Sequence, residues 1–105
     1  RSTLKIRRTI KHMYSLKKSE EAICRLADTD PAAAEALGLL SVRYSDAELA
    51  HTLLIGAIYI ERRNDQVWQL AMRGHISEST AYRYRKRYIA TFYHFYRNLL
   101  DKRAQ

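Results

Sequence analysis

Glycine and proline are scarce in this chain of 105 residues, which contains three glycines and one proline. Folds made of many short strands need turn residues between them, and Gly-rich phosphate-binding loops need clustered glycines. The shortage therefore argues against an all-β fold and against such a loop. Because 47% of the residues are apolar, a hydrophobic core can still form, and the length suits a single domain over residues 1–105.

Cysteine and long apolar runs are also nearly absent. The single cysteine, Cys24, excludes an intramolecular disulfide and is typical of a reducing compartment. The longest uninterrupted apolar run, residues 53–60, is eight residues long, which is too short to span a bilayer. The N-terminus lacks the apolar segment of a signal peptide. We therefore expect a cytoplasmic protein that makes no contact with a membrane.

Positive charge predominates, with a formal net charge of +8, but it is unevenly distributed. Residues 1–27 contain eight basic and two acidic residues, a net charge of +6. Residues 28–61 contain one basic and six acidic residues, a net charge of −5. Residues 62–105 contain ten basic and three acidic residues, a net charge of +7. Two basic segments that share a face would form a surface for an anionic partner, and nucleic acid is the first candidate.

The spacing of apolar residues predicts helices through most of the chain. The N-terminal segment, residues 4–27, forms either one long helix or two, because the polar stretch 17–21 interrupts its apolar stripe. Asp30 is a suitable N-cap for the next helix, and Pro31 suits its first position because the missing N–H has no partner there in any case. Gly38 either lies within that helix or ends it.

Three further helices are expected after this point. A capping box at residues 45–48 predicts the start of a central core helix. Either Asn64 or Asp65 is expected to cap a short helix over 66–73, and a long helix follows over 78–102. The apolar residues of the central helix are Ala50, Leu53, Leu54, Ala57 and Ile58. The expected fold is all-α, a compact bundle of about five helices whose last helix is extended.

Residues 66–87 have the pattern of a helix-turn-helix. Gly74 and His75 form the predicted turn, and Ser77 is the expected cap of the second helix. A glycine in such a turn supplies positive φ, but here Gly74 stands one residue earlier than in the commonest register, and His75 takes the usual glycine place. The small Ala71 lets the two helices cross closely. The residues predicted to face the core are Leu70, Ala71, Ile76, Ala81 and Tyr84.

The second helix of this motif divides into an apolar face and a basic face at 100° per residue. Opposite the inward residues lie donors and positive charge suited to the major groove of duplex DNA. The candidate base-reading residues are Ser79, Tyr82, Arg83 and Lys86. The candidate contacts to the DNA backbone are Arg73, His75, Ser77, Thr80, Arg85 and Arg87. Arg85 lies nearer the inward side, so we assign it a structural role or a phosphate contact.

Beyond the motif, the apolar stripe of the last helix continues through Tyr88 and Phe92 to Leu99. These rings are expected to pack on the N-terminal and central helices. A homodimer interface is the alternative, because aromatic side chains favour interface cores and DNA readers often pair on two-fold sites.

Other reactive residue types have simpler interpretations. Trp68 is expected to anchor the core, His51 to be a satisfied core or boundary histidine, and Cys24 to be a small buried residue. The histidines and the cysteine do not have the spacing of a metal site. We find no catalytic arrangement, and we expect a protein without enzymatic activity, metal or cofactor.

The run 59–63 (YIERR), Val67-Trp68, the block 76–87 (ISESTAYRYRKR) and Phe92 resemble the C-terminal part of phage ArpU/RinA-type transcriptional regulators, which are similar to the fourth region of sigma factors. The resemblance covers roughly residues 40–95. It implies a phage or prophage regulator that binds duplex DNA near promoters in a bacterial host. On that pattern, Ser79, Tyr82, Arg83 and Lys86 occupy the base-reading positions.

The leading hypothesis is therefore a sequence-specific, double-stranded DNA-binding transcriptional regulator. An RNA-binding or nonspecific nucleic-acid module is the first alternative, since Tyr and Arg side chains alternate in the last helix and can stack on unpaired bases. The second alternative is a protein-interaction domain that acts on the transcription machinery. RNA polymerase and a second copy of the chain are the further partners under consideration.

Overall fold

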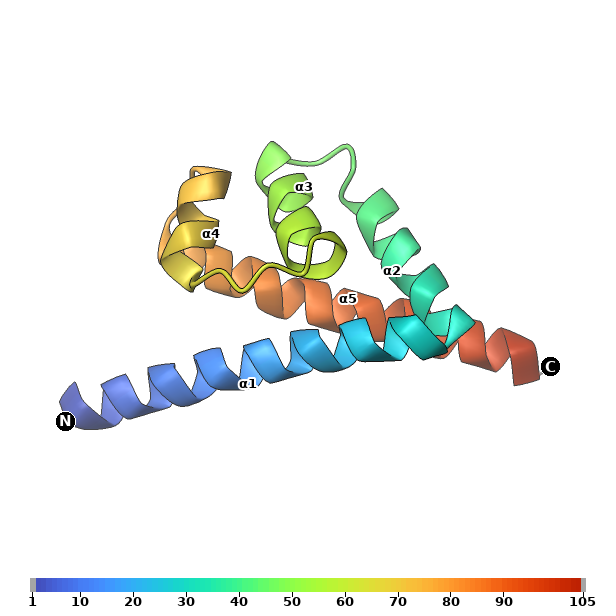
Figure 1. The fold of residues 1–105 in the computed structure, drawn as a ribbon, viewed down its shortest axis with the longest axis horizontal. Coiled ribbons are helices and arrows are strands. Elements are labelled where there is room, and N and C mark those ends of the chain that lie inside the picture. The colour runs from blue at the N-terminus through green and yellow to red at the C-terminus, as the bar shows by residue number, and fades with distance from the viewer. Residues whose placement is uncertain (1, 105) are drawn as a thin grey trace.

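The structure is a computed structural model that describes the backbone of residues 2–104 and the side chains of residues 15–104. Helices make up nearly all of this part of the chain. No strand occurs within this part of the chain, in agreement with the predicted all-α class (Figure 1). The elements are α1 (Ser2–Thr29), α2 (Pro31–Arg43), α3 (Leu49–Ile55), the π-helix η1 (Gly56–Ile60), α4 (Val67–Gly74) and α5 (Glu78–Ala104).

The N-terminal segment forms one helix, α1, without a break at the polar stretch 17–21. Asp30 then caps α2 as predicted: its Oδ1 accepts a hydrogen bond of 2.9 Å from the Ala32 N–H, and Pro31 occupies the first turn. The Tyr96 hydroxyl donates to Asp30 Oδ2 at 2.5 Å, which also ties this cap to α5. Gly38 lies inside α2 and does not end it.

The capping box predicted at residues 45–48 is wrong. The Ser45 hydroxyl donates back to the Val42 carbonyl at 2.8 Å, so it belongs to the end of α2. A turn follows, and α3 begins only at Leu49, with Glu48 in the N-cap position and no side-chain cap. The Glu48 carboxylate instead accepts a hydrogen bond from Tyr84 of α5. A tertiary contact thus takes the acidic group that a capping box would use.

The central helix is shorter than predicted and continues as a π-helix. After Ile55 the backbone bonding widens, and the Glu61 N–H donates to the Gly56 carbonyl five residues earlier at 2.8 Å. Leu54 and Ala57 are buried as expected, but Leu53 is 38% exposed, so its predicted place in the core is wrong. Wide turns of this kind often occur at functional sites, and here the turn redirects the chain towards α4.

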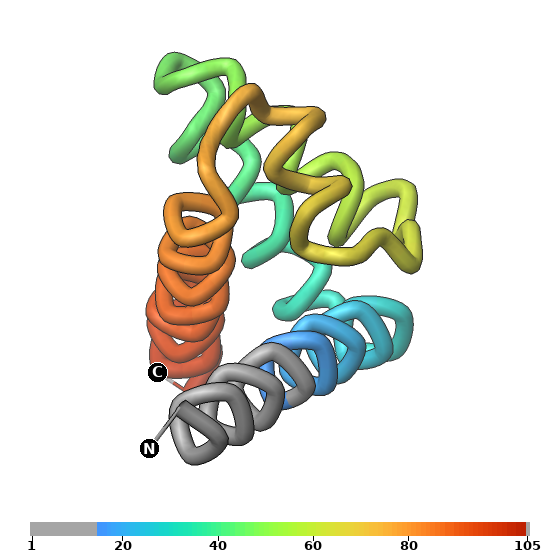
Figure 2. Tube along the Cα trace, turned by 90° about the vertical axis from the view of Figure 1, so that its left-hand side faces the viewer, coloured from blue at the N-terminus to red at the C-terminus, as the bar shows by residue number. Residues whose placement is uncertain are grey.

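One hydrophobic core draws on α1, α2, α3, η1, α4 and α5. Figure 1 shows α2, α3 and α4 together on one side of α5, and Figure 2 shows α3 and α4 above the space between α5 and the end of α1. The largest fully buried side chains are Ile23, Leu40, Leu54, Tyr88 and Phe92. The core thus fixes α5 against every other helix that surrounds it.

The extended part of α5 packs within the chain. Tyr88 and Phe92 are fully buried, and α2 is the main neighbour of α5, with α1 making a smaller contact. The prediction of packing on the N-terminal helix is therefore confirmed. The central helix contributes His51, whose Nδ1 lies 2.6 Å from the Tyr88 hydroxyl, but the Ala-rich α2 is the larger neighbour because small side chains let two helices approach closely.

Candidate nucleic-acid interface

The first helix of the candidate site, α4, begins at Val67 with Gln66 as its N-cap. The Gln66 N–H donates to Gln69 Oε1 at 2.7 Å, which satisfies a backbone donor at the start of the helix. The cap predicted at residue 64 or 65 is wrong. Asp65 instead accepts a hydrogen bond from Arg63 at 3.1 Å and forms an ion pair with Arg73 at 3.3 Å, which links the last turn of α4 to the segment before this helix.

The turn between α4 and α5 lies where it was predicted. His75 adopts the left-handed conformation, with φ 55° and ψ 43°, whereas Gly74 keeps a negative φ. Gly74 is needed for a different reason. A Cβ at this position would lie 3.0 Å from Leu54 Cδ1 and 3.3 Å from Ala50 Cβ, so its absence lets α4 close on α3. His75 thus holds the left-handed position that a glycine usually takes in such a turn, as the register of the sequence indicates.

His75→Gly should raise the free energy of unfolding by up to about 1 kcal/mol, because glycine adopts the left-handed conformation without the steric cost that a Cβ imposes. Urea denaturation followed by circular dichroism measures this change. Gly74→Ala is the matched variant on the neighbouring residue, and it should lower stability because the new Cβ meets Leu54. A loss of stability in His75→Gly would show that the His75 side chain makes a stabilising contact.

The start of α5 is held by a cluster of hydroxyl groups. The Thr80 N–H donates to Ser77 Oγ at 3.1 Å, which confirms Ser77 as the cap. The Ser77 hydroxyl lies 2.8 Å from Thr80 Oγ1 and 3.2 Å from Ser79 Oγ. Arg83 donates to Thr80 Oγ1 at 3.3 Å, so the first turn of α5 orients a guanidinium from the next turn.

The inward side of α5 contains a buried ion pair. Arg85 donates to both carboxylate oxygens of Glu20, from Nε at 2.9 Å and from Nη2 at 2.6 Å, and the two side chains are 6% and 7% exposed. Of the two roles considered for Arg85, the phosphate contact is therefore wrong and the structural role holds. No local feature of the sequence points to Glu20 as the partner, because it lies 65 residues away on α1.

The outward side of α5 presents cations without acidic partners. Arg83, Lys86 and Arg87 are all exposed, and none of them forms an ion pair with a carboxylate of residues 15–104. Ser79 is exposed on the same side. The Lys86 ammonium lies 5.5 Å from the centre of the half-buried Tyr82 ring, and Arg87 lies 5.9 Å from that of Tyr84. The four predicted base-reading residues thus lie together on one accessible surface.

The residues predicted to contact the DNA backbone differ in their exposure and in their partners. Arg87 and His75 are exposed. The side chain of Arg73 is partly exposed, and its guanidinium is paired with a carboxylate on the preceding segment. The hydroxyls of Ser77 and Thr80 are engaged in capping the start of α5, and the Thr80 N–H donates to Ser77 Oγ. The N-terminal basic segment, which is also expected to contribute to a surface for an anionic partner, lies outside the described side chains as far as residue 14.

A cluster of aromatic rings packs against the inward side of α5, opposite its exposed cations. His51 is buried, and its Nδ1 lies 2.6 Å from the Tyr88 hydroxyl. The centre of its ring lies 4.3 Å from the ring centre of Tyr84 and 4.7 Å from that of Tyr44. Burial lowers the pKa of His51, which disfavours the protonated form of the ring. The Tyr84 hydroxyl donates to Glu48 at 2.7 Å, which raises the pKa of Tyr84. The prediction of a satisfied core histidine is confirmed.

Trp68 does not anchor the core. Its side chain is 51% exposed, and the neighbouring Met72, one turn further along α4, is 68% exposed. The core positions of α4 are filled by Leu70 and Ala71, with Val67 packed at the edge. A helix of eight residues has one narrow buried face, and Trp68 falls outside it. The prediction from hydrophobicity alone is therefore wrong.

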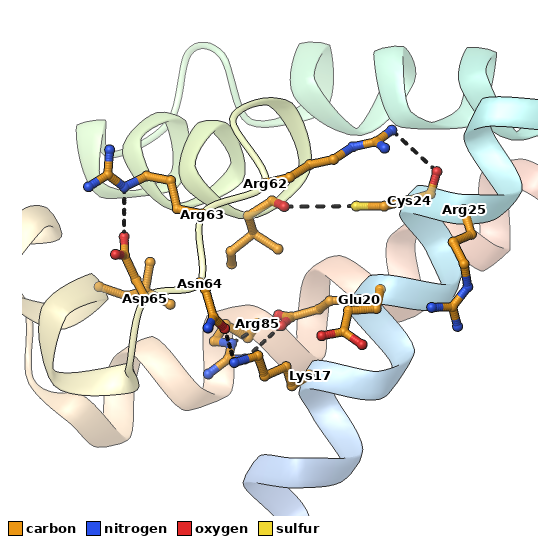
Figure 3. Close-up of a pocket in the computed structure, with 12 residues that line it drawn as sticks. Lys17, Glu20, Cys24, Arg25, Arg62, Arg63, Asn64, Asp65 and Arg85 are labelled. Carbon is orange, nitrogen blue, oxygen red and sulfur yellow. Dashed lines mark hydrogen bonds and ion pairs between the residues drawn. The ribbon is translucent and has the colours of Figure 1, made fainter.

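A hollow of about 500 Å³ lies between α1, the segment after η1 and α5 (Figure 3). Its charged groups largely satisfy one another. Arg62 pairs with Asp28 at 2.6 Å, Lys17 donates to Asn64, and Arg85 closes the floor through its bond to Glu20. These contacts link α1 to the segment before α4. Because the charges that line the hollow are of both signs and largely paired, the hollow does not favour a ligand of either charge.

Cys24 borders this hollow as a free, buried thiol. Burial raises the pKa of the Cys24 thiol, which disfavours the nucleophilic thiolate and agrees with the predicted core role. No group of three or more potential metal ligands occurs among the described residues. None of the helices in the described part of the chain is both long and apolar enough to cross a membrane.

No protein-family model, curated protein or solved structure matches this chain. The assignment of function therefore depends on the geometry of α4, the turn and α5.

Proposed function

We propose that the chain is a sequence-specific transcriptional regulator that binds double-stranded DNA, of the phage ArpU/RinA type. In this proposal α4, the turn and α5 act as a helix-turn-helix, and the N-terminal half of α5 enters the major groove. The observation that carries the proposal is the cluster of Arg83, Lys86 and Arg87 on the outward side of α5. These cations are exposed and lack carboxylate partners within residues 15–104.

The distribution of ion pairs supports this interpretation. Five other arginines, Arg62, Arg63, Arg73, Arg85 and Arg103, pair with acidic residues of the same chain. The charge left on the outward side of α5 is thus available to phosphates and to guanine edges, which Arg reads with two parallel hydrogen bonds. Ser79 and Tyr82 beside it offer further donors to bases.

The alternative of RNA binding through stacking is less well supported. Tyr88 and Phe92 are fully buried, and Tyr84 is held against His51 and Glu48. These rings are engaged within the protein, whereas stacking on unpaired bases requires an accessible ring face. A protein-interaction role is compatible with DNA binding and is taken up below.

Arg83→Ala should weaken binding to a selected duplex by about 5- to 150-fold, the equivalent of about 1–3 kcal/mol, because a bidentate base contact is lost. The target is first selected from random duplex DNA, and affinities are then measured by fluorescence anisotropy at several salt concentrations. Arg97→Ala is the matched control, since Arg97 is exposed further along the same helix. It should change affinity by less than about threefold.

Equal losses for Arg83→Ala and Arg97→Ala, on specific and on random duplex, would contradict base reading by Arg83. Stronger competition by single-stranded RNA than by duplex DNA would favour the alternative function. The same selection tests pairing of the protein, because a two-fold motif among the enriched sequences is the result expected of a homodimer.

A further inference from the structure

The exposed side of α4 forms an apolar groove with the turn and the start of α5. Trp68 and Met72 lie one helical turn apart on its rim, and they are among the most exposed large apolar side chains of the described residues. The groove is lined by Trp68, Ala71, Met72, His75, Ile76, Ser77 and Glu78. We call this surface the Trp68 groove.

The fold does not require large apolar residues at these positions. Leu70 and Ala71 already fill the buried face of α4, and Trp68 and Met72 point away from it. Contiguous exposed apolar surface on a small domain is typical of an interaction site. Trp and Met are enriched in the cores of protein interfaces, and Trp often contributes a large share of the binding energy.

The charge at the groove identifies the chemistry of its occupant. Glu78 is the only carboxylate among the lining residues, and it forms no ion pair with any residue from 15 to 104. A carboxylate beside an apolar surface repels phosphate and attracts Lys or Arg. At 100° per residue, Glu78 lies roughly 140° around α5 from Arg83 and roughly 80° from Lys86, so it borders the surface assigned to DNA without sharing the face of Arg83.

We propose that the Trp68 groove docks an amphipathic helix of another protein. The apolar side chains of that helix, spaced three or four residues apart, insert between Trp68 and Met72, and a Lys or Arg one turn away pairs with Glu78. This inference rests on the proposed function in one respect. The groove ends where α5 begins, so a regulator bound to DNA through Arg83 and Lys86 presents the groove to a protein on the neighbouring DNA.

The probe is a displayed library of amphipathic helical peptides of about 18 residues, selected for binding to the full chain. The selected peptides are expected to carry aromatic or Leu residues spaced three or four positions apart, with a basic residue beside them. Trp68→Ala should weaken their binding at least about tenfold, as expected for an interface residue of this kind. Leu49→Ala, which removes an apolar side chain on α3 that is 70% exposed, more than Trp68 at 51%, should leave their binding within about twofold.

Repeating the peptide selection on the Glu78→Lys variant distinguishes specific docking from nonspecific hydrophobic binding. The winners should then carry Asp or Glu in place of the basic residue. Winners that bind independently of Trp68, or whose charge does not change with residue 78, would overturn the proposal. So would self-association of the chain that Trp68→Ala abolishes, because the occupant would then be a second copy.

DNA binding of the same variants separates this inference from the proposed function. Trp68→Ala should keep the affinity for the selected duplex within about twofold, whereas Arg83→Ala should lower it. A larger loss for Trp68→Ala would assign the groove to the DNA surface and contradict a protein partner there. The peptide selection needs no DNA, so its outcome stands even if the chain fails to bind a specific duplex.

Discussion

Glu20→Ala is expected to lower the free energy of unfolding by about 3–5 kcal/mol, because it leaves the Arg85 guanidinium buried without a counter-charge. Both carboxylate oxygens of Glu20 accept hydrogen bonds from Arg85, and neither side chain has appreciable contact with solvent. The change is a large fraction of the stability of a small domain. Chemical denaturation at neutral pH, followed by circular dichroism at 222 nm, measures it.

Glu21→Ala is the matched control, since Glu21 is the adjacent, exposed carboxylate on the same helix. It should change stability by no more than about 0.5 kcal/mol. The double variant Glu20→Leu with Arg85→Met should recover most of the lost stability, because an apolar pair removes the cost of burying charge. Equal effects of Glu20→Ala and Glu21→Ala would show that the pair is solvated and contributes little.

The buried pair also has a consequence for the candidate interface. Arg85 lies between Arg83 and Lys86 along α5 but on the opposite side of the helix. Its two parallel bonds to Glu20 fix the rotation of α5 relative to α1, and hence the direction in which the outward cations point. A hydrogen-bonded ion pair specifies orientation more strictly than apolar packing does, because the bonds need defined angles.

The elements with local signals could be predicted from the sequence. Asp30 and Pro31 start α2, and Ser77 starts α5, because a capping side chain bonds to backbone only two or three residues away. The inward stripe of α5 follows from helical periodicity, and Tyr88 and Phe92 are indeed buried. The surface formed by Ser79, Tyr82, Arg83 and Lys86 follows from the same periodicity.

Features that depend on distant residues could not be predicted. Nothing near Ser45 shows that Glu48 bonds to Tyr84 and leaves the capping box unformed. The role of Arg85 depends on Glu20, and the role of Gly74 depends on Leu54, both far away in the sequence. Trp68 is hydrophobic enough for a core, but the short α4 turns it outward. Its exposure becomes informative only once the buried face of α4 is known.

The uneven charge of the sequence is explained by the same contacts. Acidic residues of the middle segment pair with basic residues from the last segment, as Asp28 does with Arg62 and Glu35 with Arg103. Part of the basic excess in the last segment is therefore paired with acidic residues of the same chain, mostly at the surface. The exposed cations of this segment that form no ion pair with residues 15–104 include the group formed by Arg83, Lys86 and Arg87 on the outward side of α5.

Phe92→Ala should lower the free energy of unfolding by about 3–5 kcal/mol, since it removes a fully buried ring and leaves a cavity between α5 and α2. The ring also loses an edge contact with Tyr93, at 5.1 Å between centres, and a stacked contact with Tyr96 at 5.7 Å. Phe95→Ala, the same change at a half-buried position one turn on, should cost less than half as much. Thermal and urea denaturation compare the two. A larger loss of unfolding free energy for Phe95→Ala than for Phe92→Ala would contradict this prediction. It would show that the half-buried side of α5, and not its contact with α2, stabilises the part of this helix beyond the candidate interface.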